Sequence, residues 1–156
     1  MQIAYFAVGK TTSAAVRQLT DEYFGRIQRY ARFEEIVIDN TTVKATDAEA
    51  VKAMEGDLLL KKILPQDYVV LLDERGKEYS SEEFAVYLQK LFNRSPRRLC
   101  FVTGGAYGFS EAVYARADGM LRLSKMTLAH QLVRAVFAEQ LYRAFTIIHH
   151  EPYHHR

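Results

Sequence analysis

The chain has little cysteine, no tryptophan and few prolines. Cys100 is its one cysteine, and three prolines occur among 156 residues. A lone cysteine excludes an intramolecular disulfide and a cysteine metal cluster, and its place in an apolar run favours a buried, inert thiol over a nucleophile. No apolar run approaches the roughly 20 residues that cross a bilayer, and the first ten residues lack the features of a signal peptide. We therefore expect a cytoplasmic protein with no membrane partner.

An excess of charge of one sign is also missing. The formal net charge is +2 at pH 7, whereas a dedicated nucleic-acid module usually carries a stronger basic bias. This charge permits an RNA partner without requiring one. Hydrophobic residues make up 49% of the chain and charged residues 26%, which is ordinary for a globular protein. The length suits one domain with one core, so residues 1–156 are expected to form a single domain.

Apolar runs alternate with helical patterns, and this alternation predicts an α/β fold with a mainly parallel sheet of about five strands. Strands are expected at residues 2–8, 33–39, 68–73, 99–103 and 119–123, with a turn at 74–77 after the third. Helices are expected after Thr12 or Ser13, after Asp47, after a capping box at residues 80–83, after Ser110 and over residues 129–148. The polar segment 40–46 is the most mobile part by this reasoning.

Two of the predicted helices carry apolar stripes. The first helix is expected to turn Val16, Leu19, Tyr23 and Ile27 inward. The last helix has one stripe at Val133, Val136, Phe137, Leu141, Ala144, Phe145 and Ile148, and a second at Leu132, Ala135, Ala138 and Tyr142. A partner subunit and burial within the same chain explain the second stripe equally well.

Two arginines interrupt the apolar pattern of the last helix. Arg134 and Arg143 could each neutralise a phosphate. Their more usual role would be a salt bridge, here with Glu139 or Glu151.

Two loops in the last third of the chain are rich in backbone donors and poor in ionisable side chains. The apolar run 99–103 ends in Gly104-Gly105-Ala106-Tyr107-Gly108, and a second apolar run ends in Leu123-Ser124-Lys125-Met126-Thr127-Leu128-Ala129-His130. A glycine cluster alone is more often a tight turn than a binding loop. Paired with a second strand end, it indicates a small cofactor held by main-chain groups.

Better-known phosphate-binding motifs do not fit. Gly9-Lys10-Thr11 resembles the end of a P-loop, but Ala4 stands where that motif needs glycine, and no G-x-G-x-x-G follows the first strand. His149, His150, His154 and His155 crowd the last eight positions and raise the hypothesis of a metal site. We favour a site without metal, because only Glu151 accompanies these histidines and a tail gives poor ligand geometry.

Several short motifs occur in a characteristic order. They are Ala7-Val8-Gly9-Lys10, Leu72-Asp73-Glu74-Arg75-Gly76-Lys77, Gly104 to Gly108, Leu123 to Gln131, Glu139 to Ala144 and Pro152-Tyr153-His154. In these motifs the whole chain resembles the bacterial ribosomal large-subunit RNA (pseudouridine-N3)-methyltransferases of the SPOUT, or α/β-knot, class. The resemblance implies a C-terminal trefoil knot, a rare exception to unknotted chains.

The resemblance also implies S-adenosylmethionine as the methyl donor, held among three knot loops. The implied cofactor-binding residues are Leu72, Gly104 with its neighbour Gly105, Leu123, Ser124, Lys125, Met126, Thr127 and Leu128. It further implies a homodimer in which the tail of one subunit completes the site of the other. The methyl group would go to N3 of a pseudouridine in large-subunit ribosomal RNA on the assembled ribosome.

The reaction requires that the N3 proton leaves as the methyl group arrives. Tyr153 and His154 are the candidate residues for that step, and Arg143 and Arg156 are candidates for orienting phosphate or base. Two alternatives remain open: a knotted methyltransferase acting on another RNA such as tRNA, and a non-catalytic ribosome-binding factor that keeps the fold.

Overall fold

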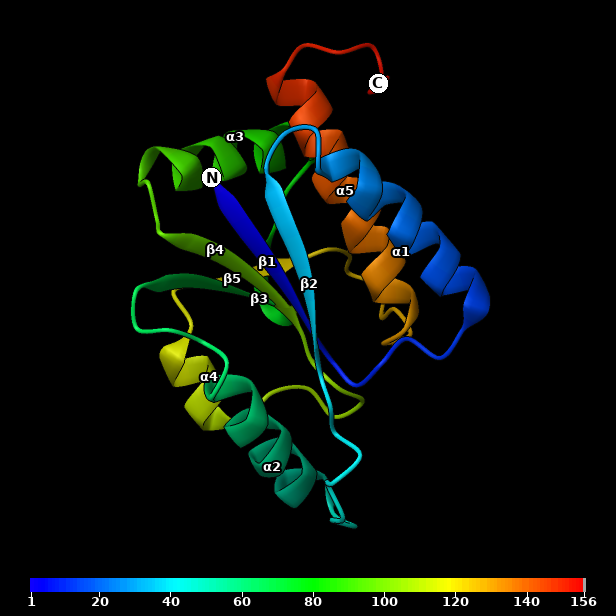
Figure 1. Ribbon diagram of the computed structural model, residues 1–156, viewed down its shortest axis with the longest axis vertical. Coiled ribbons are helices and arrows are strands. Elements are labelled where there is room, and N and C mark those ends of the chain that lie inside the picture. The colour runs from blue at the N-terminus through cyan, green and yellow to red at the C-terminus, as the bar shows by residue number, and fades with distance from the viewer. Residues whose placement is uncertain (156) are drawn as a thin grey trace.

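In the computed structural model, which describes residues 1–155, five strands and five helices alternate along the chain (Figure 1). The strands are β1 Gln2–Val8, β2 Arg32–Ile38, β3 Asp67–Glu78, β4 Arg98–Thr103 and β5 Gly119–Arg122. The helices are α1 Ala14–Ile27, α2 Ala48–Leu60, α3 Ser81–Asn93, α4 Glu111–Arg116 and α5 Leu132–Ile148. Arg156, a candidate orienting residue, lies outside the described residues. The predicted α/β alternation is confirmed.

The five strands form one parallel sheet in the order β2-β1-β4-β3-β5. Because all strands run the same way, their carboxyl ends share one edge, where ligands bind in open α/β sheets. The glycine loop after β4 and the loop after β5 both leave from this edge. The topology therefore brings together the loops that the sequence singles out.

Helices cover both faces of the sheet (Figure 1). The helices α1, α3 and α5 lie on one face, and α2 and α4 lie on the other. Alternate residues of the central strands consequently enter two separate cores: Tyr5 and Phe101 pack with Phe137 of α5, whereas Phe6 and Val102 belong to the cluster beneath α2 and α4. Burial on both faces explains why these strands read as continuous apolar runs.

Local side-chain hydrogen bonds begin four of the helices at the predicted residues. Ser13, Asp47, Ser80 and Ser110 each accept a hydrogen bond from a backbone N–H of the first turn. At Ser80 the capping box is complete, because the Glu83 carboxylate accepts from the Ser80 N–H at 2.8 Å. The sequence pattern was sufficient here since these interactions involve neighbours three residues apart.

The turn predicted at residues 74–77 is wrong, because β3 continues through this segment to Glu78. Leu72 and Lys77 both pair with Leu121 of β5, so the register shifts between them. Gly76 makes the continuation possible: a Cβ there would lie 2.6 Å from the backbone of Leu121. The irregular part of β3 thus packs tightly against β5, close to the start of the loop that follows β5.

The inward face predicted for the first helix is only partly correct. Thr20, Phe24 and Ile27 are the buried residues of α1, and Leu19 is 44% exposed. Phe24 takes the core position because its ring packs against Tyr5 and Phe33. Tyr23 is only partly buried, and its ring packs against that of Tyr142 in α5.

The second apolar stripe of α5 is largely buried within the same chain. Ala135, Ala138 and Tyr142 are all buried, and α5 packs against α1 and α3, whereas Leu132 stays 43% exposed. This stripe therefore gives no independent argument for a partner subunit. The helix begins at Leu132 rather than at residue 129. Among the described residues, no helix has the length and apolar character needed to cross a membrane.

Candidate functional site

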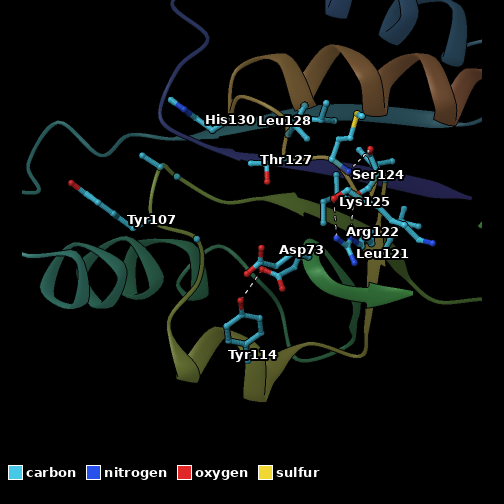
Figure 2. A pocket seen from close by; sticks show the side chains of 18 residues that line it. Asp73, Tyr107, Tyr114, Leu121, Arg122, Ser124, Lys125, Thr127, Leu128 and His130 are labelled. Atoms are coloured by element: carbon cyan, nitrogen blue, oxygen red, sulfur yellow. Dashed lines mark hydrogen bonds between the residues drawn. The ribbon is translucent and has the colours of Figure 1, made fainter. Parts of the chain in front are cut away.

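A cavity of about 380 Å³ opens at the carboxyl edge of the sheet (Figure 2). Its walls come from three segments: β3 near Leu72, where the pairing of β3 with β4 ends, the glycine loop, and the loop that follows β5. Leu72, Gly105 and the whole run 123–128 line it. These three segments are separated by about 30 and about 20 residues along the chain, and they meet at one cavity as predicted.

Arg122 holds the loop after β5 in place. Its Nε donates to the carbonyl oxygen of Ser124 at 3.0 Å, and its Nη2 donates to that of Lys125 at 3.1 Å. The Ser124 hydroxyl in turn accepts from the Met126 N–H at 3.0 Å. These bonds fix a loop without regular secondary structure, which suits a site that binds through main-chain groups.

An acidic corner faces this loop across the cavity (Figure 2). The Tyr114 hydroxyl donates to the Asp73 carboxylate at 2.7 Å, and the Arg75 guanidinium lies 4.1 Å from the centroid of the Tyr114 ring. Burial and the hydrogen bond to Asp73 raise the pKa of Tyr114 to about 12. Tyr114 therefore keeps its proton at neutral pH and can act as a donor to the carboxylate.

The glycine loop makes a tight turn over the cavity. The Gly108 N–H donates to the Gly105 carbonyl at 3.1 Å, and Gly108 has a φ of 85°, a conformation that favours glycine. On the loop, the Tyr107 side chain is 56% exposed at the cavity. His130 also lines the cavity, from the segment before α5.

The predicted cofactor residues reach the cavity with one exception. Leu72, Gly105, Leu123, Ser124, Lys125, Met126, Thr127 and Leu128 all line it, and Gly104 does not. Gly104 instead packs against the Phe109 ring, which would lie 3.2 Å from a Cβ at that position. Met126 is 81% exposed, so its side chain is directed mostly to solvent.

The three predicted catalytic residues form a separate cluster on α5 and the tail. The Tyr153 hydroxyl donates to Glu139 at 3.0 Å, and Arg143 pairs with Glu139 and stands 4.8 Å from the Tyr153 ring. Nδ1 of His154 lies 3.2 Å from Arg143 Nη1. None of these residues lines the cavity of its own chain.

Distance along α5 explains this separation. Arg143 stands ten residues after Val133, which lines the cavity, and a helix rises 1.5 Å per residue, so the cluster lies about 15 Å farther along the axis. Burial and the hydrogen bonds with Tyr23 and Glu139 raise the pKa of Tyr153 above its ordinary value. Tyr153 is therefore a hydrogen-bond donor in this arrangement rather than a base.

Arg134 has neither of its predicted roles. It is 1% exposed and donates to the carbonyl oxygens of Val8 and Gly9 and to the Thr11 hydroxyl, at 2.8 to 3.0 Å. Burial lowers the pKa of Arg134. It fastens the end of β1 to α5. The salt bridge predicted for Arg143 with Glu139 is confirmed, and Glu151 accepts from Tyr30 instead.

The tail histidines do not assemble a metal site. Across residues 1–155, no group of three or more histidine, cysteine, aspartate or glutamate side chains is placed to hold a metal ion. His149 instead stacks on Tyr30, with ring centroids 5.0 Å apart. His154 lies between Arg143 and Glu82.

Sequence reasoning missed Asp73, Tyr114 and Arg122 as cavity residues. Asp73 directly follows the predicted third strand, so its position at the strand end was an available signal. Tyr114 and Arg122 reach the site through tertiary contacts that leave no local pattern.

Comparison with known proteins places the chain in a family. A family model described as "Predicted SPOUT methyltransferase" matches residues 1–154. A crystal structure of a methylase family protein from Neisseria gonorrhoeae superposes with a TM-score of 0.50 at 12% identity, covering 90% of this chain and 81% of that one. At this identity the superposition supports the fold alone.

Curated relatives match over their full length. A protein of Christiangramia forsetii is 51% identical, with 100% of both chains covered, and one of Parabacteroides distasonis is 47% identical, with 99% of both covered. A more distant relative from Geobacter sulfurreducens is 44% identical over 99% of this chain and 100% of its own. All three are named Ribosomal RNA large subunit methyltransferase H. By its match over nearly every residue, this chain belongs to the SPOUT methyltransferase family.

Proposed function

We propose that this chain transfers the methyl group of S-adenosylmethionine to N3 of a pseudouridine in large-subunit ribosomal RNA, on the assembled ribosome. The observation that carries the proposal is the cavity formed by the three loops, in a chain whose relatives at 42–51% identity are named as large-subunit ribosomal RNA methyltransferases. We further propose that residues 1–156 act as one catalytic domain, in the cytoplasm.

The cavity has the charges that this cofactor needs. S-adenosylmethionine has an ammonium, a carboxylate and a sulfonium, and its sulfonium supplies an already activated methyl group. Asp73 and Glu74 provide negative charge at one side of the cavity, and Lys125 provides positive charge at the other. The loop after β5 and the glycine loop add backbone groups. We propose that Leu72, Gly105 and residues 123–128 hold the cofactor, with Gly104 supporting the loop from outside the cavity.

A second subunit would supply what the cavity lacks. Arg143 lies about 15 Å along α5 from Val133, which lines the cavity of its own chain. The cluster that Arg143 forms with Tyr153 and His154 is fixed by Glu139 and Glu82. We propose a homodimer in which this cluster meets the partner's cavity, so that the target base lies between the two. Arg143 would then orient base or phosphate, and His154 would receive the N3 proton. The trefoil knot stays a prediction.

The test is methylation of ribosomes from a strain that lacks the protein. Purified protein and S-adenosylmethionine carrying a labelled methyl group are incubated with 70S ribosomes, with free large subunits and with bulk tRNA. We expect label only in large-subunit RNA of assembled ribosomes, mapped by mass spectrometry to N3 of one pseudouridine. Label in tRNA would contradict the proposed substrate, and RNA binding without any methyl transfer would support a non-catalytic factor instead.

A further inference from the structure

The glycine loop separates two cavities of very different size. On one side, Gly105 and Gly108 line the cofactor cavity. On the other side lies a much smaller cavity of about 10 Å³, lined by Glu55 and Gly56 of α2 and by Gly108, Phe109 and Ser110. Gly105 and Gly108 have no side chains, so a group behind the loop contacts the loop backbone directly.

Glu55 stands behind this loop as a buried carboxylate. Its residue is 5% exposed, and Oε2 accepts a hydrogen bond from Asn40 Nδ2 at 2.9 Å. Oε1 is buried and has no hydrogen-bond partner among the described residues. The nearby cation Lys52 pairs with Glu49 instead. Burying a carboxylate without a cation costs free energy, so the Asn40 hydrogen bond and the close packing around Glu55 must offset that cost.

Close packing joins Glu55 to the loop. A Cβ at Gly105 would lie 2.6 Å from Oε1 and 2.8 Å from Oε2 of Glu55, so the carboxylate rests on the Gly105 backbone. The next residue, Gly56, allows a similar approach at the far end of the loop, where a Cβ would lie 2.6 Å from the Ser110 hydroxyl. The helix α2 therefore supports both ends of the segment 105–110.

Asn40 fixes Glu55 from the opposite side. A Cβ at Gly9 would lie 3.1 Å from Asn40 Nδ2, and Gly9 has a φ of 79°, so the amide group is seated against the end of β1. The carboxyl group of Glu55 is thus held between Asn40 and Gly105.

We propose that Glu55 is a positioning residue for the cofactor: through Gly105 it sets the height of the glycine loop over the cavity, and Asn40 fixes Glu55 in that position. This inference rests on the proposed use of the cavity by S-adenosylmethionine. Shape and the bond from Asn40 matter, rather than charge. Glutamine has the same shape and an oxygen that can accept from Asn40, so it should replace Glu55 without loss.

The first experiment compares Glu55→Ala, Glu55→Gln and the exposed control Glu49→Gln on the same helix. We expect Glu55→Ala to raise the Kd and KM for S-adenosylmethionine about tenfold, the effect of losing one buried hydrogen bond, with kcat at saturating cofactor unchanged. Glu55→Gln and Glu49→Gln should match the wild type. An unchanged Kd in Glu55→Ala, or a Glu55→Gln variant as weak as Glu55→Ala, overturns the proposal.

A double-mutant cycle tests the contact itself. Gly105→Ala places a methyl group against the Glu55 carboxylate, and Glu55→Ala removes the obstacle. We therefore expect Gly105→Ala to weaken cofactor binding less in the Glu55→Ala background than in the wild type. Equal losses in both backgrounds would show that Glu55 does not act through Gly105. If Glu55→Ala fails to fold, Asn40→Ala replaces it in the first experiment, with a raised KM for the cofactor expected and an unchanged KM contradicting the proposal.

The wild-type titration separates this inference from the proposed function. A wild-type protein that does not bind S-adenosylmethionine contradicts the proposed function. A wild-type protein that binds it, with a Kd that Glu55→Ala leaves unchanged, contradicts only the role of Glu55.

Discussion

His154 is held in one orientation by its two neighbours. An arginine can only donate hydrogen bonds, so the 3.2 Å contact with Arg143 makes Nδ1 of His154 an acceptor. Nε2 then carries the proton and lies 3.2 Å from the Glu82 carboxylate. The lone pair of the ring is then on Nδ1 and faces Arg143, so His154 can take the N3 proton only when Arg143 turns to the base or phosphate.

Replacing His154 with alanine should therefore slow methyl transfer and leave cofactor binding unchanged. Loss of a general base typically costs 10²- to 10⁴-fold in rate, and we expect a fall of about 10²-fold or more. Single-turnover methylation of ribosomes measures the rate, and calorimetry measures the affinity for S-adenosylmethionine. His155→Ala, at the exposed neighbouring position, is the control. Equal rates for His154→Ala and the wild type would remove His154 from the mechanism.

A bulky residue at Gly105 should push the glycine loop into the cavity. The side chain of a valine there would meet the Glu55 carboxylate, which lies 2.6 Å from the Cβ position, and the clash would displace the loop toward the cavity that Gly105 lines. We expect Gly105→Val to abolish measurable binding of S-adenosylmethionine by calorimetry. Gly25→Val is the matched control, since nothing lies within 4 Å of a Cβ at Gly25. Unchanged binding in Gly105→Val would contradict the assignment of the cavity.

At the scale of elements, a buried ion pair joins β3 to β4. Asp67, whose side chain is fully buried, accepts from Arg98 Nη2 at 2.6 Å and from the Leu64 N–H at 2.8 Å. Burial disfavours the charged carboxylate, but the hydrogen bonds from Arg98 and Leu64 outweigh it and lower the pKa of Asp67. Two parallel strands are thereby fixed in register at their amino ends, opposite the edge where the cavity opens.

The pair gives a prediction with a definite pH dependence. The pKa of Asp67 is lower in the folded protein than in the unfolded chain, where it is near 3.8. The ionised carboxylate therefore stabilises the folded protein fully above the unfolded pKa, and this stabilisation is lost as the pH falls through the folded pKa. Asp67→Asn should lower the free energy of unfolding at pH 7 by about 3 kcal/mol, and by less at pH 3. Urea unfolding at both values measures this. Glu34→Gln, which alters the exposed partner of Arg98, should cost less than about 1 kcal/mol. Equal losses at both pH values would contradict the assignment.

Which elements could be predicted from the sequence depends on the range of the interactions that form them. The caps at Ser13, Asp47, Ser80 and Ser110 use hydrogen bonds to residues three positions away, and all four are where the sequence placed them. The continuation of β3 depends on Gly76 fitting against Leu121, 45 residues later, and no local pattern reveals it. The turn predicted there was the consequence.

The same distinction holds for the candidate site. The glycine loop and the run 123–128 follow strand ends, and parallel strands bring such ends to one edge, so these residues could be predicted. Tyr114 and Arg122 act through contacts with Asp73 and with backbone carbonyls that only folding creates. Arg134 was misread for the same reason, because its partners, the carbonyls of Val8 and Gly9, lie 126 and 125 residues away.

At the scale of the whole molecule, the cavity and the tail cluster are two halves of the proposed active site. The tail cluster packs against α5, α1 and α3 of its own chain through Glu139, Tyr23 and Glu82. Both halves thus form within a single chain. A two-fold dimer places two copies of each half symmetrically, so each complete site would contain the cavity of one subunit and the tail of the other.

Mixing two inactive variants tests this arrangement. Gly105→Val has a blocked cavity and an intact tail, and His154→Ala has the reverse. In a mixed dimer with shared sites, the intact cavity of one subunit meets the intact tail of the other. Co-refolding equal amounts should therefore restore about a quarter of the wild-type sites, since half of the dimers are mixed and each has one good site. Methylation of ribosomes measures the recovery, and each variant refolded alone is the control. No recovery in a mixture shown to contain mixed dimers would mean that each chain uses its own tail.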